Sequence, residues 1–287
     1  AADSQGLLKR SQKLYGMEIY CNFTPSIEIV YMEKRPLLLV SNDDGVNAKG
    51  IHELIKVLRP LADLIVVAPD GPRSGSSGAI TSEHPLRCVK VEQAPGLTVY
   101  KCSGTPVDCV KLALDSLVPR VPDLVIGGIN HGDNSSVNIH YSGTMGVVIE
   151  GCLKAIPSIG FSLCNHSADA DFSPCLPYIE LIVKRVLEKG LPQWTCLNVN
   201  FPNTEQLNGV RICRQTQGVW TNEFVKADHP RGGNYYWLTG EYVNLEPDQE
   251  DTDHWALDHD YVAITPVQVD MTAYALLAEM KNWDLKL

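Results

Sequence analysis

The sequence contains no apolar run near the roughly 20 residues that span a bilayer, no block of basic residues and no Cys-x-x-Cys pair. Its net charge of -10 argues against a surface that binds nucleic-acid polymers by neutralising phosphates. The nine cysteines are odd in number and scattered, which favours reduced, mostly buried thiols over zinc sites or disulfides. The N-terminus lacks the uninterrupted apolar core of a signal peptide. We therefore expect a soluble, cytoplasmic protein that binds neither a membrane nor a nucleic-acid polymer.

The 287-residue chain is long enough to bury one large core. Residues 1–31 are polar and aperiodic, and we expect this N-terminal extension to lie outside the fold. Over residues 32–219, short β-rich runs alternate with helical periodicity, which is typical of βαβ units around a parallel sheet. Residues 220–260 depart from this alternation and are expected to form extended arms that contact another subunit. Residues 261–287 end the chain with a strand and a helix.

The alternation predicts a series of strands and helices. Apolar runs predict strands at 37–41, 64–69, 86–92, 97–102, 123–129, 158–163, 196–201, 209–215 and 261–265. Helical periodicity predicts helices at 48–59, from 106 onward, after 142–144, at 176–188 and at 272–283. The fold class is therefore α/β, with a doubly wound, mostly parallel sheet.

Two adjacent carboxylates, Asp43 and Asp44, follow directly on the strand at 37–41. Two like charges at the mouth of a sheet repel, so one is protonated or a cation neutralises both. Asp-Asp-Gly also makes an ordinary turn, and the pair alone leaves both interpretations open. Ser74 and Asn130 follow later strands, and the carboxyl ends of parallel strands converge on one crevice. Together these oxygens suit a hard cation such as Mg²⁺ or Mn²⁺.

Two short segments, at 104–105 and 142–144, open helices after successive strands. Their backbone N–H groups and hydroxyls can receive an anion with help from the helix dipole. Each segment can equally be a simple helix cap. We expect phosphate contacts from Asn42, Gly104, Thr105, Asn134, Ser142, Gly143 and Thr144.

Five motifs together resemble those of the SurE (survival protein E) family. They are Ser-Asn-Asp-Asp-Gly-Val at 41–46, Ala-Pro-Asp with Arg-Ser-Gly at 68–75, Gly-Thr-Pro-x-Asp-Cys-Val at 104–110, Gly-Ile-Asn-x-Gly-x-Asn at 128–134 and Tyr-Ser-Gly-Thr at 141–144. The resemblance extends over residues 36–270. The Gly-Pro at 71–72 departs from the family pattern, and residues 1–31 have no counterpart in it.

The resemblance implies a Rossmann-like fold and a phosphatase that acts on nucleoside 5′- and 3′-monophosphates, with some action on short polyphosphate. It also implies one divalent metal ion per subunit, Mg²⁺ or Mn²⁺, held by Asp43, Asp44, Ser74 and Asn130. Finally, it implies homodimers or homotetramers that form through C-terminal arms. The aromatic residues within 220–260 favour such an interface, because large aromatic surfaces need burial.

The economical mechanism is metal-assisted hydrolysis by an activated water, because no Ser-His-Asp or Cys-His arrangement stands out. Asp43 and Asp44 are then the catalytic residues, with Asp43 as the candidate general base or water orienter. His131 and His140 are expected to be rim or structural residues.

Two alternatives remain open. Asp43 could be the nucleophile of an aspartyl-phosphate phosphatase, although the usual Asp-x-Asp spacing is absent, or the chain could bind nucleotides without catalysis, although no Gly-x-Gly-x-x-Gly is present.

Overall fold

The computed structural model describes residues 13–14, 17–18 and 35–285. The chain divides into two units, Ala1–Pro36 and Leu37–Leu287. In the first unit, two-residue strands β1 (Lys13–Leu14) and β2 (Met17–Glu18) pair in antiparallel fashion. The prediction that residues 1–31 lie outside the fold concerns residues that fall, for the most part, outside the described ones.

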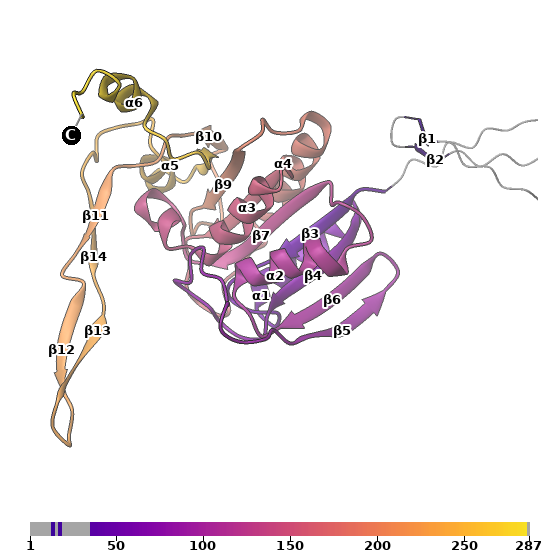
Figure 1. Cartoon of the computed structure of the whole chain (residues 1–287), viewed down its shortest axis with the longest axis horizontal. Helices are drawn as coiled ribbons and strands as arrows, with labels where there is room; N and C mark the ends of the chain where they lie inside the picture. Colours follow the sequence, from indigo (N-terminus) through magenta and orange to yellow (C-terminus); the bar gives the residue numbers. More distant parts are fainter. Residues whose placement is uncertain (1–12, 15–16, 19–34, 286–287) are drawn as a thin grey trace, which may run out of the picture. The chain divides into compact units, whose positions relative to one another are not determined.

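A nine-stranded mixed sheet forms the core of the second unit. Its parallel strands are β3 (Leu37–Ser41), β4 (Asp63–Pro69), β6 (Leu97–Cys102), β7 (Leu124–His131), β8 (Ser158–Leu163) and β9 (Thr195–Phe201). Three strands near the edges break this pattern: β5 (Cys88–Ala94) is antiparallel to β6, and the parallel pair β10 (Val210–Ile212) and β15 (Val262–Gln268) runs antiparallel to β9. The order is β10-β15-β9-β8-β7-β3-β4-β6-β5 (Figure 1). The predicted α/β class with a mostly parallel sheet is confirmed.

Helices cover both faces of this sheet. They are α1 (Lys49–Leu58) and α4 (Leu176–Lys189) on one face, and α2 (Pro106–Leu112) and α3 (Gly143–Leu153) on the other. Leu38 of β3 packs with α1 and α4 in one apolar cluster, whereas its neighbour Leu39 packs with α2 and α3 in another. Adjacent residues of a strand point to opposite faces, so a continuous apolar run is what a strand covered on both sides requires.

The order of the strands reverses beside β3. From β3 the chain moves to β4 and β6 on one side and then returns to β7, β8 and β9 on the other. Ligands of open parallel sheets bind at such a switch point, outside the carboxyl ends of the strands. Asp43 and Asp44 follow β3, and Asn130 lies at the end of β7. The topology therefore directs attention to the crevice between these two strand ends.

The C-terminal part of the chain carries a long antiparallel hairpin, residues 218–244, called the arm below. Its strands are β11 (Gly218–Thr221), β12 (Phe224–Asp228), β13 (Asn234–Leu238) and β14 (Glu241–Asn244). β11 pairs with β14 and β12 with β13, which makes two successive ladders that stand out from the sheet in Figure 1. The remaining elements are the π-helical turn Ala113–Leu117, the 3-10 turn Ser136–His140, α5 (Asp253–Asp258) and α6 (Tyr274–Met280).

The segment predicted as an arm, 220–260, does not behave as one piece. Residues 220–244 form most of the hairpin. Thr252, Asp253 and Ala256, in contrast, are fully buried, and α5 packs beside β15. The helix was missed because its six residues are too short to show a helical period in the sequence.

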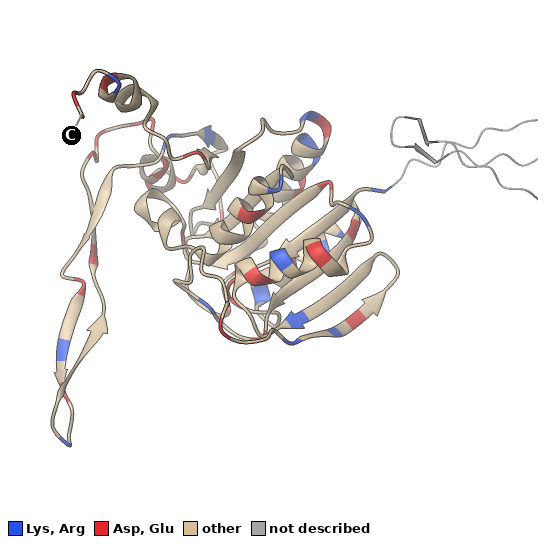
Figure 2. Cartoon of the chain, in the orientation of Figure 1, with Lys and Arg blue, Asp and Glu red and all other residues tan. Residues whose placement is uncertain are grey.

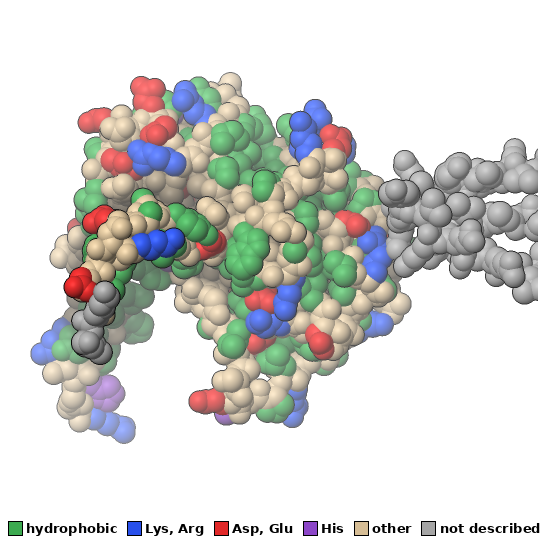
Figure 3. Space-filling view, turned by 45° about the horizontal axis from the view of Figure 1, so that its top comes forward, with side chains coloured by type: hydrophobic (Ala, Val, Ile, Leu, Met, Phe, Trp, Pro, Cys, Tyr) green, Lys and Arg blue, Asp and Glu red, His purple; other side chains and the backbone are tan. Residues whose placement is uncertain are grey.

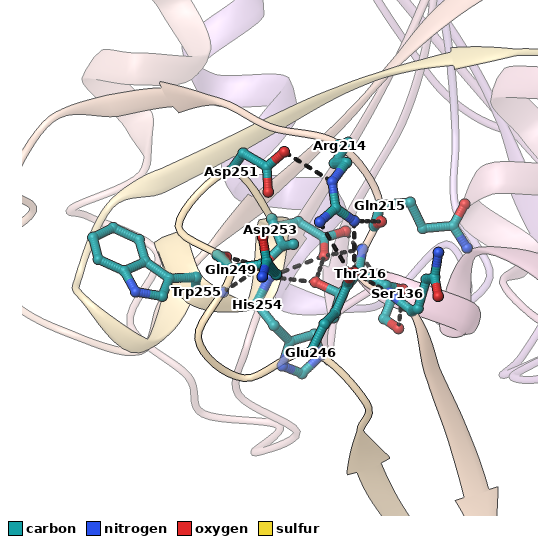
Figure 4. Close-up of polar contacts among 12 residues, drawn as sticks. Ser136, Arg214, Gln215, Thr216, Glu246, Gln249, Asp251, Asp253, His254 and Trp255 are labelled. Carbon is teal, nitrogen blue, oxygen red and sulfur yellow. Dashed lines mark hydrogen bonds and ion pairs between the residues drawn. The ribbon is translucent and has the colours of Figure 1, made fainter.

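Asp253 anchors the base of the arm (Figure 4). Its Oδ1 accepts hydrogen bonds from the backbone N–H of Thr216 (3.0 Å) and from the Thr216 hydroxyl (2.5 Å). Its Oδ2 accepts the N–H of Ser136 (2.9 Å), in the loop between β7 and α3. Beside them Arg214 forms an ion pair with Glu246 (2.6 Å). The root of the arm and the β7–α3 loop are therefore joined through one buried carboxylate.

No helix in the described part of the chain is both long and apolar enough to cross a membrane.

Candidate active site

One side chain, Asn42, closes the turn after β3. Its Nδ2 donates to the carbonyl of Gly45 (3.1 Å), and its Oδ1 accepts the N–H of Gly45 (3.2 Å). Gly45 has a φ of +100°, and a Cβ there would lie 3.0 Å from the backbone of Gly71. The sequence Asn-Asp-Asp-Gly thus folds into a tight turn that fixes the backbone of Asp43 and Asp44. Asn42 was predicted to contact phosphate; it is buried, and its amide serves this turn.

Asp43 is almost fully buried, with 4% of its surface exposed. Its Oδ1 accepts a hydrogen bond of 2.6 Å from the hydroxyl of Thr144, in the first turn of α3. The backbone N–H of Gly143 also donates to this carboxylate. Burial raises the pKa of Asp43 to about 6; the bond from Thr144 opposes the rise, and the charge of Asp44 adds to it. The ionised carboxylate is therefore costly unless a positive charge compensates it.

Asp44 accepts the backbone N–H of His131 (3.1 Å) through its Oδ2. Burial raises the pKa of Asp44, and this hydrogen bond opposes the rise. The ring of His131 is itself fully engaged: Nε2 accepts the N–H of Gly50 (3.3 Å), and Nδ1 donates to the carbonyl of Ser167 (2.8 Å). These partners assign the neutral tautomer with its proton on Nδ1. His131 thus joins three loops and is not a free acid or base.

The two predicted neutral ligands lie next to the residues that anchor these carboxylates. Arg73 donates its backbone N–H to the carbonyl of Asp43 (2.6 Å), and Ser74 follows Arg73 in an exposed loop. Asn130 precedes His131 at the end of β7 and is 8% exposed. Its Nδ2 donates to the carbonyl two residues further on (2.7 Å), so its Oδ1 is on the opposite side of the amide. The fold thus ties the segments that carry Ser74 and Asn130 to Asp43 and Asp44 through the backbone N–H groups of Arg73 and His131.

The chemistry of this donor set fits a hard cation. Two adjacent carboxylates, one buried and one partly buried, repel each other, and a bound cation would relieve the repulsion. Among the described residues no three His, Cys, Asp or Glu side chains gather into a possible metal site, so a cation here needs neutral oxygens as well. The hydroxyl of Ser74 and the amide oxygen of Asn130 are of this kind. Such an all-oxygen set suits Mg²⁺ or Mn²⁺ better than zinc, which favours thiolate and imidazole.

Helix α3 begins directly against Asp43. Ser142 caps the helix, because its Oγ accepts the N–H of Met145 (3.0 Å). A Cβ on Gly143 would lie 2.7 Å from the Cβ of Asp43 and 2.8 Å from the Oγ of Ser76, so only glycine fits there. The Ser76 hydroxyl is buried without a hydrogen-bond partner among the residues described. A helix N-terminus, a carboxylate and an unpartnered hydroxyl therefore meet, which suits an anionic group bound together with a cation.

Gly104 and Thr105, also predicted to contact phosphate, form the cap of α2. The Thr105 hydroxyl accepts the N–H of Asp108 (3.1 Å) and donates to the carbonyl of Ala79 (2.7 Å). The Thr105 N–H donates to Oδ2 of Asp108 (2.9 Å), which completes a capping box. The side chain and N–H of Thr105 are therefore used within the chain.

Asn134 belongs to a buried polar network that the sequence analysis missed. Its Nδ2 donates to the Oγ of Ser162 (2.8 Å), its N–H donates to Oδ1 of Asn200 (2.7 Å), and its carbonyl accepts Nδ2 of Asn198 (2.7 Å). Asn198 and Asn200 alternate along β9, and two amides at a spacing of two within an apolar strand were the available signal. The network holds the loop that joins β7 to α3.

A cavity of about 580 Å³ opens beside Asp44. Lys49, at the start of α1, and His166, in the loop after β8, line it. Lys49 donates from Nζ to the carbonyl of Asp169 (3.1 Å), which fixes the rim. Neither Lys49 nor His166 was predicted from the sequence. His166 follows the strand next to β7, so the convergence of parallel strand ends was the signal that could have identified it.

The comparison with known families agrees with this geometry. The chain matches the family described as Survival protein SurE over residues 38–222. This chain belongs to the SurE family. The matched segment contains Asp43, Asp44, Ser74 and Asn130 together with the start of α3, so the whole candidate site lies within it.

Relatives and solved structures extend the match over most of the chain. A protein of Phocaeicola vulgatus named 5′-nucleotidase SurE is 68% identical over 88% of this chain and 99% of its own length. A protein of the same name from Bacteroides thetaiotaomicron is 61% identical over 87% of this chain and 96% of its own length. The crystal structure of the SurE protein from Aquifex aeolicus superposes with a TM-score of 0.74 and 36% identity, covering 86% of this chain and 98% of that one. The resemblance inferred from the five motifs is thus confirmed.

Proposed function

We propose that this SurE protein is a divalent-metal-dependent phosphatase that hydrolyses nucleoside 5′- and 3′-monophosphates. The observation that carries the proposal is the adjacent pair Asp43 and Asp44, of which the buried Asp43 meets the N-terminus of α3 close to the Ser76 hydroxyl, which has no hydrogen-bond partner among the described residues. The name 5′-nucleotidase SurE, carried by relatives 68% and 61% identical, supports it. The finer parts of the proposal are the metal, the 3′-activity and a weaker action on short polyphosphate.

The residues divide the work of hydrolysis among them. The positive end of the α3 helix dipole and the hydroxyl of Ser76 stabilise negative charge on the phosphoryl oxygens. Asp43, oriented by Thr144, directs the attacking water and accepts its proton. One divalent ion per subunit, Mg²⁺ or Mn²⁺ bound by Asp43, Asp44, Ser74 and Asn130, would polarise the phosphoryl group and lower the pKa of water.

A substrate panel tests this proposal. Phosphate release from 5′- and 3′-monophosphates is measured with Mg²⁺, with Mn²⁺ and with a chelator. We expect metal-dependent turnover that the chelator abolishes, and a loss of at least about 100-fold in Asp43→Asn and Asp44→Asn, as removal of a metal ligand implies. The matched control is Asp115→Asn, which changes an exposed carboxylate outside the crevice. Nucleotide binding without phosphate release would favour the alternative of a non-catalytic binder.

The second alternative makes Asp43 a covalent nucleophile. Such an intermediate would retain labelled phosphate on the protein after acid quenching. Direct hydrolysis leaves no label on the chain. The adjacency of Asp43 and Asp44, in place of an Asp-x-Asp spacing, favours direct hydrolysis.

We further propose that the protein assembles as a homodimer or homotetramer through the arm. Aromatic and aliphatic side chains of its outer ladder, β12 and β13, are largely exposed, namely Phe224 (65%), Tyr236 (62%), Trp237 (63%) and Leu238 (69%). Most of the arm is uncharged in Figure 2, and hydrophobic side chains are visible on its surface in Figure 3. A clustered apolar surface of this kind is typical of a protein–protein interface.

A further inference from the structure

Three cysteines from three elements meet beside the sheet. Cys88 begins β5, Cys102 ends β6 and Cys109 lies in α2. Cys88 and Cys102 are direct cross-strand partners. The two that lie deepest, Cys102 and Cys109, are completely buried, whereas Cys88 is partly exposed at the edge of the sheet.

The ladder geometry places Cys88 and Cys102 within disulfide range. The N–H of Ser103 donates to the carbonyl of Arg87 (2.9 Å) and the N–H of Arg87 donates to the Ser103 hydroxyl (3.0 Å), so these two residues face each other as a hydrogen-bonded pair in which a side chain makes one of the two bonds. Hydrogen-bonded and non-hydrogen-bonded pairs alternate in an antiparallel ladder, so the next pair, Cys88 and Cys102, is of the second kind. In such pairs the Cα atoms approach to about 4.5 Å, and disulfides join Cα atoms about 4.4–6.8 Å apart.

Cys102 is the most acidic of the three thiols. The Cys109 thiol donates a hydrogen bond to its sulfur, and this bond together with the N–H of Gly104 lowers the pKa of Cys102 to about 6 against the effect of burial. Burial and the charge on Cys102 raise the pKa of Cys88 to about 11. The cluster therefore pairs a thiolate with a neighbouring thiol, which is the arrangement that thiol oxidation needs.

We propose that Cys88 and Cys102 form an oxidation site, which hydrogen peroxide and other small hydroperoxides convert into a reversible disulfide. Cys102 reacts first and Cys88 resolves. The site does not depend on the proposed phosphatase activity.

The chemistry balances as follows. The Cys102 thiolate attacks one oxygen of the peroxide, the O–O bond breaks, and hydroxide leaves and takes up the proton that Cys102 had released. Cys102 is then a sulfenic acid. The Cys88 thiol attacks its sulfur, the S–S bond forms, and the sulfenic hydroxyl leaves with the Cys88 proton as water. Two thiols and one hydrogen peroxide thus yield one disulfide and two waters.

The oxidant reaches Cys102 from the edge of the sheet. β5 is the outermost strand on its side, and its residues 89–93 are exposed. An edge strand pairs with only one neighbouring strand, so its local unfolding requires less free energy than that of a central strand. In the proposed reaction, local opening of β5 uncovers Cys102, and its closing brings Cys88 back beside it.

A second pair of contacting cysteines provides an internal comparison. Cys152 of α3 and Cys196 of β9 are hydrogen-bonded to each other and both are buried. Burial raises the pKa of each thiol, so neither is a thiolate near neutral pH. Contact between two sulfurs without acidity or access is not enough for rapid oxidation. We therefore expect this pair to stay reduced when the first pair reacts.

The test treats the full-length protein with a small excess of hydrogen peroxide, blocks the remaining thiols, and maps the linked peptides by mass spectrometry. We expect a peptide that joins Cys88 to Cys102, with a loss of two free thiols per chain, and complete reversal by dithiothreitol. In Cys88→Ser, dimedone should trap the sulfenic acid on Cys102. In Cys109→Ala, the reaction should slow by about threefold or more, because Cys102 loses its hydrogen-bond donor.

The matched control is Cys152→Ser, which should form the Cys88–Cys102 disulfide at the wild-type rate. Circular dichroism of each variant confirms that it is folded before its thiols are counted. Absence of the Cys88–Cys102 linkage in folded wild-type protein overturns the proposal. Oxidation of the Cys152–Cys196 pair at the same rate also overturns it, because the reaction would then be unselective.

Discussion

Thr144 donates its hydroxyl hydrogen to Oδ1 of Asp43 at a distance of 2.6 Å, across 101 residues of sequence. Thr144 is completely buried, and it sits in the first turn of α3, whereas Asp43 follows β3. The bond therefore fixes one carboxylate oxygen of the candidate site and leaves the other close to Gly143. The position of α3 and the orientation of the carboxylate depend on each other.

We predict that Thr144→Val lowers phosphatase activity by about 10- to 100-fold, since a hydrogen bond to a charged acceptor contributes roughly 1.5–3 kcal/mol. Valine has nearly the shape of threonine but cannot donate. Thr144→Ser keeps the hydroxyl and should remain within about fivefold of wild type, with a loss of stability from the missing methyl group. Equal activities in the two variants would show that the bond does not matter for turnover.

The pKa of Asp43 predicts how the stability of the metal-free protein changes with pH. Its folded pKa of about 6 lies above the ordinary value of 3.8. The folded state therefore holds its proton more tightly than the unfolded chain, and this stabilising effect is complete below pH 4 and is lost as the pH rises to about 6. In a chelator, Asp43→Asn should match wild type near pH 4 and exceed it by on the order of 2–3 kcal/mol at pH 7.

Denaturant titrations of both proteins at several pH values measure this difference. Adding Mg²⁺ or Mn²⁺ at pH 7 should raise the midpoint of wild type but not that of Asp43→Asn, because a ligand that binds only the folded state stabilises it. A stability gap that is the same at pH 4 and pH 7 would contradict the assignment of the effect to the charge of Asp43.

Glycine at position 143 is predicted to be required for activity. The added methyl group of Gly143→Ala would lie 2.7 Å from the Cβ of Asp43, so the helix start or the carboxylate must move. Overpacking of this kind costs roughly 1–3 kcal/mol, and we expect activity to fall by at least about 10-fold, as small misplacements of catalytic groups do. Gly78→Ala is the matched control, because a Cβ there meets nothing within 4 Å. Similar activities of both variants would argue against a tight fit at 143.

Much of the fold could be predicted because its central strands are buried on both faces. The run Leu37 to Val40 is apolar throughout, and the strands predicted at 37–41 and 158–163 have the observed bounds. The strands of the arm could not be predicted in this way. Their residues are mostly exposed and pair only with each other. The run Tyr-Tyr-Trp-Leu of β13 therefore does not mark a buried strand, and its partner β12 shows no two-residue alternation of apolar and polar residues.

The residues of the candidate site also fall into two groups, those that the sequence predicts and those whose role it does not. Asp43 and Asp44 are visible in the sequence because two adjacent acids after an apolar strand are unusual. The roles of Asn42 and Thr105 could not be predicted from the sequence. A short polar side chain can bind a ligand or its own backbone, and contacts with neighbouring turns decide which of the two it does. Such side chains bond readily to nearby N–H groups, and the sequence alone does not distinguish the two uses.

The last prediction concerns the arm. Replacing Tyr235, Tyr236 and Trp237 with serine should lower the assembly state in sedimentation while the sheet and its site stay folded, because these side chains are 39–63% exposed and contribute little to the core of the single chain. Trp220 and Tyr242, in contrast, donate hydrogen bonds to Asn138 (2.9 Å) and Ser136 (2.7 Å) of the same chain.

Trp220→Ser and Tyr242→Ser should therefore destabilise the β7–α3 loop, which these side chains hold, and lower activity. They should not lower the assembled mass selectively, as the triple variant at 235–237 does. A control replaces Val89 and Val91, exposed hydrophobic residues of β5, with serine and should leave the mass unchanged. The interface proposal fails if the soluble triple variant at 235–237 keeps the full wild-type mass. The assignment of Asp43 and Asp44 would survive that result, since both precede the arm by more than 170 residues.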